Sequence, residues 1–114
     1  MSSLSVQFAM EPLRTLLFSG INPVYTSIGT PLNEGIRIFA VQNLTDVIIA
    51  FSLDGLNDNF VLPANGYRIV DVSANDALGQ GWYIPMGTRF YARTFGSPTT
   101  TGAVYVDVAY GNNV

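Results

Sequence analysis

Short apolar stretches with a two-residue repeat run along nearly the whole chain. In residues 102–111, GAVYVDVAYG, the valines occupy alternate positions, which is the pattern of a strand with one buried face. Residues 46–53, DVIIAFSL, are apolar at both parities, as in a strand that is covered on both faces. The pattern therefore predicts β-strands, and no segment carries a convincing helical repeat.

Nine segments carry strand signals, and Gly, Pro, Asn and Asp separate them at turn positions. These segments span residues 5–10, 14–19, 24–28, 36–42, 46–53, 59–63, 67–73, 89–95 and 103–110. Their short spacing predicts an all-β domain of eight or nine short antiparallel strands, arranged as a sandwich or a barrel. Residues 73–87, SANDALGQGWYIPMG, break the rhythm and predict a long loop with room for one helical turn at ANDAL.

A length of 114 residues fits one domain. Pro12 interrupts what would otherwise be one continuous N-terminal strand, because proline cannot donate a backbone hydrogen bond. We therefore expect residues 1–12 to form an N-terminal strand or arm and residues 13–114 to form a single β-sandwich domain.

The arm has two possible partners. It could leave its own sandwich and add to the exposed sheet edge of a neighbouring copy, or it could pair within its own sheet. Our candidate contacts for assembly are the apolar residues of the arm and of the following strand, together with one arginine: Leu4, Val6, Phe8, Arg14, Leu17 and Phe18.

The composition removes most catalytic and metal-binding chemistry. The chain has no Cys and no His, so disulfides, thiol nucleophiles, zinc sites and imidazole bases are excluded. The hydroxyls of residues 97–101 have no His or Lys to activate them, and the chain contains no nucleotide-binding or GxSxG motif. We expect no catalytic residue, no metal site, no cofactor and no enzymatic activity.

Charge is sparse and acidic. Only 11% of residues are charged, the formal net charge is −3, and the five cationic residues are all arginines scattered along the chain. Direct nucleic-acid binding is therefore not expected, since it needs several cations on one face. Some of the arginines are expected to pair with Glu11, Asp71 or Asp107, because the guanidinium fork suits carboxylates.

The apolar share is high, at 48% with a mean hydropathy of +0.30, so a partner is expected to cover part of the surface. A membrane span does not explain this excess, because the longest apolar run covers only residues 47–51. The first residues lack the basic start of a signal peptide, and we expect synthesis in the cytoplasm. The sequon at Asn43 is then expected to be an unused polar turn.

Three aspartates, Asp46, Asp54 and Asp58, lie close together in the sequence and raise the question of a metal or catalytic site. An EF-type calcium loop that starts at Asp54 fails, because Asn59 replaces the required Gly and Asn65 replaces the required Glu. Asp54 before Gly is a familiar turn dipeptide. Turn chemistry is the favoured interpretation, with a weak calcium site at Asp54 and Asp58, or catalysis, as the alternatives.

Aromatic side chains suggest a second function, a carbohydrate-binding β-sandwich module. Such a module would stack sugars on Trp82, Tyr83, Tyr91 and Tyr105. It requires these rings to lie exposed together on one face or at one rim of the sandwich. The simpler interpretation is that Trp82 and Tyr83 begin a strand and cover one end of the core.

The order of these stretches resembles that of small virion structural proteins of tailed bacteriophages. In that family an N-x-T unit, a hydrophobic strand and an S-x-D-G turn precede a proline-containing turn and a final G-x-V-Y-V strand. The resemblance covers nearly the whole chain and rests on GTPL (29–32), RIFAVQNLTDVIIAFSLDG (37–55), VLPANGYRIVDVSAN (61–75), GTRFYAR (87–93) and TTGAVYVDVAYG (100–111).

The resemblance implies a β-sandwich, with a jelly roll among its candidate topologies. It also implies a protein without cofactors that is made in the host bacterial cytoplasm and becomes part of the virion. Such a protein sits on the capsid as a decoration, cement or auxiliary protein, or in the head-to-tail connector or tail. Its partners would be copies of itself and other virion proteins, such as the major capsid protein or the portal.

Overall fold

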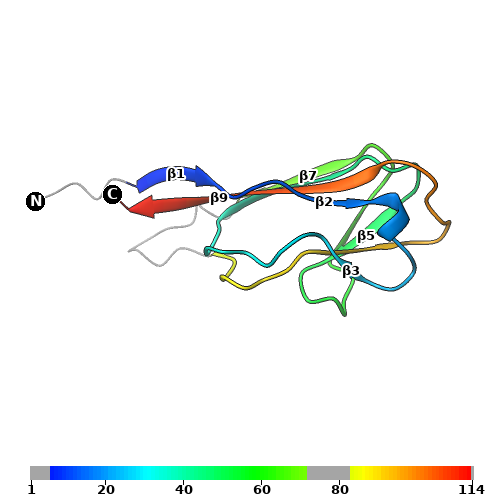
Figure 1. Cartoon of the computed structure of the whole chain (residues 1–114), viewed down its shortest axis with the longest axis horizontal. Helices are drawn as coiled ribbons and strands as arrows, with labels where there is room; N and C mark the ends of the chain where they lie inside the picture. Colours follow the sequence, from blue (N-terminus) through cyan, green and yellow to red (C-terminus); the bar gives the residue numbers. More distant parts are fainter. Residues whose placement is uncertain (1–5, 72–82, 114) are drawn as a thin grey trace, which may run out of the picture.

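Two antiparallel β-sheets pack against each other in the computed structural model, which describes residues 6–71 and 83–113 (Figure 1). The larger sheet contains β1 (Val6–Met10), β2 (Arg14–Leu17), β4 (Ile38–Asn43), β7 (Tyr67–Asp71) and β9 (Ala103–Asn113). The smaller sheet contains β3 (Thr26–Ser27), β5 (Ile49–Ser52), β6 (Phe60–Leu62) and β8 (Tyr91–Thr94). A single 3₁₀ turn, η1 (Phe18–Gly20), follows β2. The predicted all-β sandwich is confirmed, and each of the nine predicted segments contains a strand.

The strand order is that of a jelly roll. The larger sheet runs β1-β9-β4-β7, with β2 pairing on β9, and the smaller sheet runs β3-β8-β5-β6. If β1 and β2 count as one interrupted strand, two four-stranded sheets remain, and consecutive strands mostly alternate between them. This is the double Greek-key arrangement of the jelly roll.

The core lies between the sheets and contains the apolar side chains that alternate with more exposed ones along the strands. Val104, Val106 and Val108 all point inward and are buried, as their two-residue repeat predicts. Across the core, the rings of Phe39 and Phe90 meet edge to face with centroids 5.0 Å apart. Such aromatic pairs add stabilisation beyond the area that they bury.

Strand β5 is buried on both faces, as its apolar sequence predicts. It lies centrally in the smaller sheet, between β8 and β6. Its inward residues Ile49 and Phe51 belong to the core, and its outward residues Ala50 and Ser52 are small enough to be covered by their neighbours. The double burial therefore comes from a central position within this chain.

Strands β1 and β2 lie along the same edge of β9, and Pro12 marks the break between them. Met10 pairs with Ala109 and Arg14 pairs with Val106, so three residues of the break face two residues of β9, as in a β-bulge. Beyond Ala109 the last residues of β9 pair only with β1. These segments form a two-stranded ribbon at one end of a molecule that measures 57 × 22 × 22 Å (Figure 1).

One turn brings two backbones unusually close. Gly102, just before β9, has a φ of +92°, a conformation that favours glycine. A Cβ atom at this position would lie 1.9 Å from the carbonyl oxygen of Leu44. Glycine is therefore required here by both the backbone angle and the close approach of the β4–β5 loop.

Candidate functional site

The first aspartate of the acidic segment that joins β5 to β6 organises a turn. The Oδ1 atom of Asp54 accepts hydrogen bonds from the backbone N–H groups of Leu56 and Asn57, at 2.8 and 2.9 Å, and from the Ser52 hydroxyl at 2.7 Å. These bonds, the one from the Asn57 backbone first, hold the pKa of Asp54 well below its usual range. Gly55 has a φ of +76°, so the predicted Asp-Gly turn is confirmed.

The second aspartate of this segment clips the turn onto the neighbouring strand β8. The Nη2 and Nε atoms of Arg93 donate to the two carboxylate oxygens of Asp58 at 2.6 and 3.0 Å, and the Tyr25 hydroxyl donates to Oδ1. The bond from Arg93, followed by the one from Tyr25, lowers the pKa of Asp58. Burial and the hydrogen bond to Asp58 raise the pKa of Tyr25 to about 12.

Asp46 serves a different pair of loops. Its carboxylate accepts hydrogen bonds from the hydroxyls of Thr99 and Thr100 at 2.8 and 2.6 Å and from the Thr100 backbone N–H at 2.9 Å. The bond from the Thr100 hydroxyl is the main cause that keeps the pKa of Asp46 well below its usual value. This contact ties the β4–β5 loop to the loop before β9.

The three aspartates therefore each hold a different piece of backbone. Their oxygens are occupied by N–H, hydroxyl and guanidinium donors rather than converging on one point. Within the described ranges 6–71 and 83–113, no group of three or more acidic side chains is placed to hold a metal ion. The arrangement is that of loop fastening, which agrees with the interpretation favoured by the sequence.

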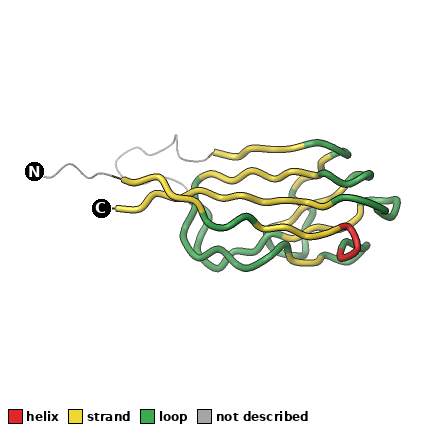
Figure 2. Tube along the Cα trace, turned by 45° about the horizontal axis from the view of Figure 1, so that its top comes forward, coloured by secondary structure: helices red, strands yellow, loops and turns green. Residues whose placement is uncertain are grey.

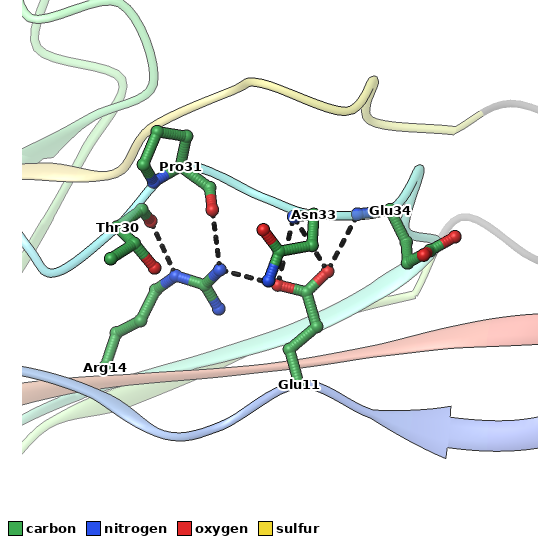
Figure 3. Close-up of polar contacts among 6 residues, drawn as sticks. All are labelled: Glu11, Arg14, Thr30, Pro31, Asn33 and Glu34. Atoms are coloured by element: carbon green, nitrogen blue, oxygen red, sulfur yellow. Dashed lines mark hydrogen bonds and ion pairs between the residues drawn. The ribbon is translucent and has the colours of Figure 1, made fainter.

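A buried ion pair lies at the break between β1 and β2 (Figure 3). Arg14 donates from Nη2 to Glu11 Oε1 at 2.5 Å and to the Pro31 carbonyl at 2.9 Å, and from Nε to the Thr30 carbonyl at 2.7 Å. Both side chains are 3% exposed. The predicted pairing of an arginine with Glu11 is confirmed, and we call this contact the Glu11–Arg14 node.

The carboxylate of the node also accepts hydrogen bonds from the protein backbone. The N–H groups of Asn33 and Glu34 donate to Glu11 Oε2 at 3.1 and 2.9 Å. Burial acts to raise the pKa of Glu11, but the bonds from Arg14 and from the two N–H groups outweigh it, so the pKa is lowered. The node thus fastens the start of β2 to the loop between β3 and β4.

The sequon asparagine is a second buried polar anchor. Asn43 is fully buried, and its amide nitrogen donates to the carbonyls of Val47, Leu62 and Pro63 at 2.9 to 3.0 Å. Its amide oxygen accepts from the backbone N–H and the hydroxyl of Thr45. The sequon residue is therefore an interior bridge between β4, β5 and β6, and the folded chain does not offer its amide to a modifying enzyme.

The exposed apolar side chains of the strands share one feature. Each large apolar side chain that is exposed in a described strand lies in an edge strand of its sheet. These side chains are Met10 of β1, Leu17 of β2, Val61 of β6, and Tyr67 and Ile69 of β7. Edge strands also carry unpaired backbone groups, so the edges combine apolar surface with hydrogen-bonding capacity.

The candidate assembly contacts lie in different environments. Leu17 and Phe18 are exposed, and the backbone of Val6 and Phe8 lies in β1, which pairs with β9 of its own chain. Arg14 differs from our expectation, because it points inward and is held by the node. Leu4 lies outside the described residues.

The tyrosines proposed for sugar stacking do not share a face. Tyr105 lies on the outer face of the larger sheet, between the buried Val104 and Val106, whereas Tyr91 lies on the outer face of the smaller sheet, where its ring packs over Gly55. Tyr83 is exposed. Trp82 and the helical turn predicted at ANDAL lie outside the described residues. The described rings therefore do not form one stacking platform.

A shallow pocket of ≈ 290 Å³ lies near η1. This volume is at the lower limit for small-molecule sites. The pocket has an apolar lining without charged side chains: Ile21, Asn22, Pro23, Thr94, Gly96 and Pro98. The main-chain bond from Thr94 to Asn22 already uses two of its polar groups, so the pocket offers few groups that could orient a ligand.

The helical content of the described chain is one short 3₁₀ turn, which is far from the length needed to cross a bilayer. No protein-family model matches the chain, and a comparison with curated proteins found no match.

Proposed function

We propose that this chain is a non-enzymatic structural protein of a bacteriophage virion, which assembles with copies of itself and with other virion proteins. The observation that carries the proposal is that every large apolar side chain exposed in a described strand lies in an edge strand of its sheet. An edge of this kind attracts another strand. Monomeric proteins blunt such edges with charged side chains, above all lysine, or with proline and bulges. This chain contains no lysine, and its bulge at Pro12 lies between β1 and β2.

Composition and sequence resemblance support the same proposal. The chain lacks His and Cys and carries few charges, as suits a subunit whose surface is largely covered in an assembly. Jelly rolls occur in viral capsid proteins and also in lectins, so the fold is compatible with a virion role. The resemblance to small phage virion proteins favours the viral role.

Two positions in the virion fit this proposal. A decoration or cement protein would bind the major capsid protein on the outside of the head, at threefold or similar positions. A connector or tail component would form a ring around one axis and would bind the portal or its neighbours. In either position the protein would be made in the bacterial cytoplasm and would need no cofactor.

The N-terminal arm supplies a possible contact between copies. In the structure β1 pairs with β9 of its own chain, and the same pairing between two chains would exchange the arm. Strand β1 could pass to a neighbour while Glu11 stays in the Glu11–Arg14 node, because Glu11 follows the last residue of β1.

Light scattering over a wide range of protein concentrations tests the proposal. We expect a discrete multimer for the full chain, and a smaller mass for a chain that starts at Met10 if the arm holds the copies together. If the full chain stays monomeric, only a decoration or cement protein that assembles on its capsid would remain compatible with the proposal. Failure to bind capsids of the encoding phage as well would contradict the proposed function.

A further inference from the structure

Both edges of the larger sheet expose large apolar side chains. Leu17 of β2 is 61% exposed at one edge, and Tyr67 and Ile69 of β7 are 67% and 64% exposed at the other. Among the described residues, β2 pairs only with β9 and β7 pairs only with β4. Figure 2 shows β7 along one margin of this sheet and β2, followed by the helical turn, along the opposite margin.

We propose that copies of this chain join head to tail, with β7 of one copy pairing with β2 of the next, so that the larger sheet continues from subunit to subunit. This inference rests on the proposed assembly function and specifies its contact. The strand directions permit it. Both β2 and β4 run antiparallel to β9, and β7 runs antiparallel to β4, so β7 and β2 run in opposite directions within one sheet. When the sheet continues into a neighbour, β7 therefore pairs with the neighbour's β2 in the antiparallel sense.

The register of this contact is limited by the faces of the two strands. Thr15 and Leu17 point away from the core, and so do Tyr67 and Ile69. Paired residues must point to the same side of a sheet. Leu17 can therefore lie opposite Tyr67 or Ile69, but it cannot lie opposite a residue of β7 that points inward.

One of the allowed registers fits best. When Leu17 lies opposite Tyr67 of the next copy, all four residues of β2 lie opposite residues of β7, and Thr15 lies opposite Ile69. A shift by two residues in one direction would leave Arg14 without a partner among the described residues of β7, which run to Asp71. A shift in the other direction would place Arg14 opposite Arg68, and like charges across a strand pair are unfavourable.

Head-to-tail contacts have a consequence for symmetry. They join two different surfaces, so they close into a ring when the rotation between subunits allows it, and otherwise they form an open filament. A twofold contact between two β7 strands would instead pair identical surfaces. If the outward faces of both copies stay on the same side of the joined sheet, a twofold contact centred on the middle of β7 places Ile69 opposite Ile69 of the other copy.

Disulfide trapping separates these possibilities, because the natural chain has no cysteine. The test uses the full chain with Leu17→Cys, Tyr67→Cys or both, under mild oxidation. Directly paired strand residues lie within disulfide range. We expect a mixture of the two single variants to give a covalent dimer that contains one of each, and the double variant to give a ladder of covalent multimers.

Two controls distinguish this contact from random collisions and from a twofold contact. Leu17→Cys mixed with Leu56→Cys, which is an exposed loop position, reports random collisions and should give at least tenfold less dimer. Ile69→Cys alone should stay monomeric, and efficient dimers of this variant would overturn the head-to-tail contact in favour of a twofold one. If light scattering shows a multimer but Leu17 and Tyr67 do not link, this contact is wrong while the assembly function stands.

Discussion

At the residue scale, the chain has few charged residues, yet it buries one ion pair, the Glu11–Arg14 node. Both side chains are 3% exposed and make five further hydrogen bonds to the backbone of residues 30–34. A buried pair adds little net stability compared with apolar residues, but loss of one partner leaves the other charge uncompensated. The node is therefore more sensitive to single substitutions than its surroundings.

We expect Glu11→Gln to lower the free energy of unfolding by about 3 kcal/mol, because Arg14 would lose its buried counter-ion. Chemical denaturation at pH 7 measures this loss. Glu34→Gln changes an exposed side chain of the same kind and should have an effect within about 0.5 kcal/mol. Equal effects of the two substitutions would contradict the structural role of the node.

The node also predicts a dependence of stability on pH. The pKa of Glu11 is lower in the folded chain than its ordinary value of 4.5. The contribution of the ionised carboxylate is thus fully present above pH 4.5 and is lost as the pH falls through the lower, folded pKa. We expect the acid-induced loss of stability to be shallower in Glu11→Gln than in the natural chain, as measured by denaturation at several pH values below 5.

Asn43 provides a second prediction at this scale. Asn43→Asp keeps the shape of the side chain but points a carboxyl oxygen at the three carbonyls that the amide nitrogen now bonds. We expect a loss of about 3 kcal/mol or more at pH 7, and a smaller loss at low pH, where the protonated acid regains one donor. Asn59→Asp is the control, because its side-chain oxygen accepts a bond from Leu53 that an aspartate can keep.

At the element scale, the close approach of two loops at Gly102 can be tested with a matched pair of glycines. Gly102 and Gly87 have nearly the same φ, +92° and +90°, but a Cβ atom would meet the Leu44 carbonyl only at Gly102. We expect Gly87→Ala to cost about 1–2 kcal/mol from the backbone angle alone. Gly102→Ala should cost at least about 2 kcal/mol more, because the β4–β5 loop must move. Thermal or chemical unfolding of both variants gives the comparison.

The loop between β5 and β6 offers a spectroscopic test. Tyr25 has a pKa of about 12, raised from 10.0 by burial and by its hydrogen bond to Asp58. We expect Asp58→Asn to move this pKa back toward 10.0, because the negative acceptor is removed. Absorbance titration of the tyrosines shows the change, and Tyr25→Phe identifies which part of the titration belongs to Tyr25. An unchanged titration would mean that the loop is not clipped to this tyrosine in solution.

The strands themselves could be predicted from the sequence, because each depends on a local pattern. The valines before Tyr110 and the Asp54-Gly55 turn identify a strand and a connection without knowledge of the rest of the chain. The order of the strands could not be predicted, since alternation is the same in every sandwich. The structure also extends β9 to Asn113, beyond the predicted end at residue 110, where β9 pairs with β1, which shows that strand boundaries depend on the partner strand.

Only some of the polar contacts could be predicted from the sequence. An arginine partner for Glu11 could be predicted, because arginine is the only cationic residue type in the chain. Its identity as Arg14 could not, since residues three apart are not neighbours in an extended strand. The clip between Asp58 and Arg93 joins residues that are 35 apart in sequence, and only the pairing of β5 with β8 brings them together. The contact between Asn43 and Thr45 could be predicted, since an Asn-x-Thr unit before a strand can form a local turn. The burial of Asn43 could not, because it depends on contacts with β6.

At the scale of the whole molecule, strand β1 lies at one end of the fold (Figure 1). The two described side chains of β1, Ala9 and Met10, do not belong to the core cluster, and among the described side chains of β9 the last that belongs to it is Val108. The ribbon of β1 and the end of β9 projects from this core (Figure 1), and two strands alone are only marginally stable in water. The ribbon is therefore the part of the fold that would gain most from a neighbouring copy.

Hydrogen exchange tests this view of the ribbon. In a chain that starts at Met10, we expect the amides of residues 110–113 to lose protection, while Val104 to Val108 stay protected by β2 and β4. If copies exchange arms, the protection of residues 110–113 in the full chain should rise with protein concentration, because the strand they pair with then comes from another molecule. Protection that does not depend on concentration would show that the arm stays on its own sheet, and unfolding of the truncated chain would show that the core needs β1.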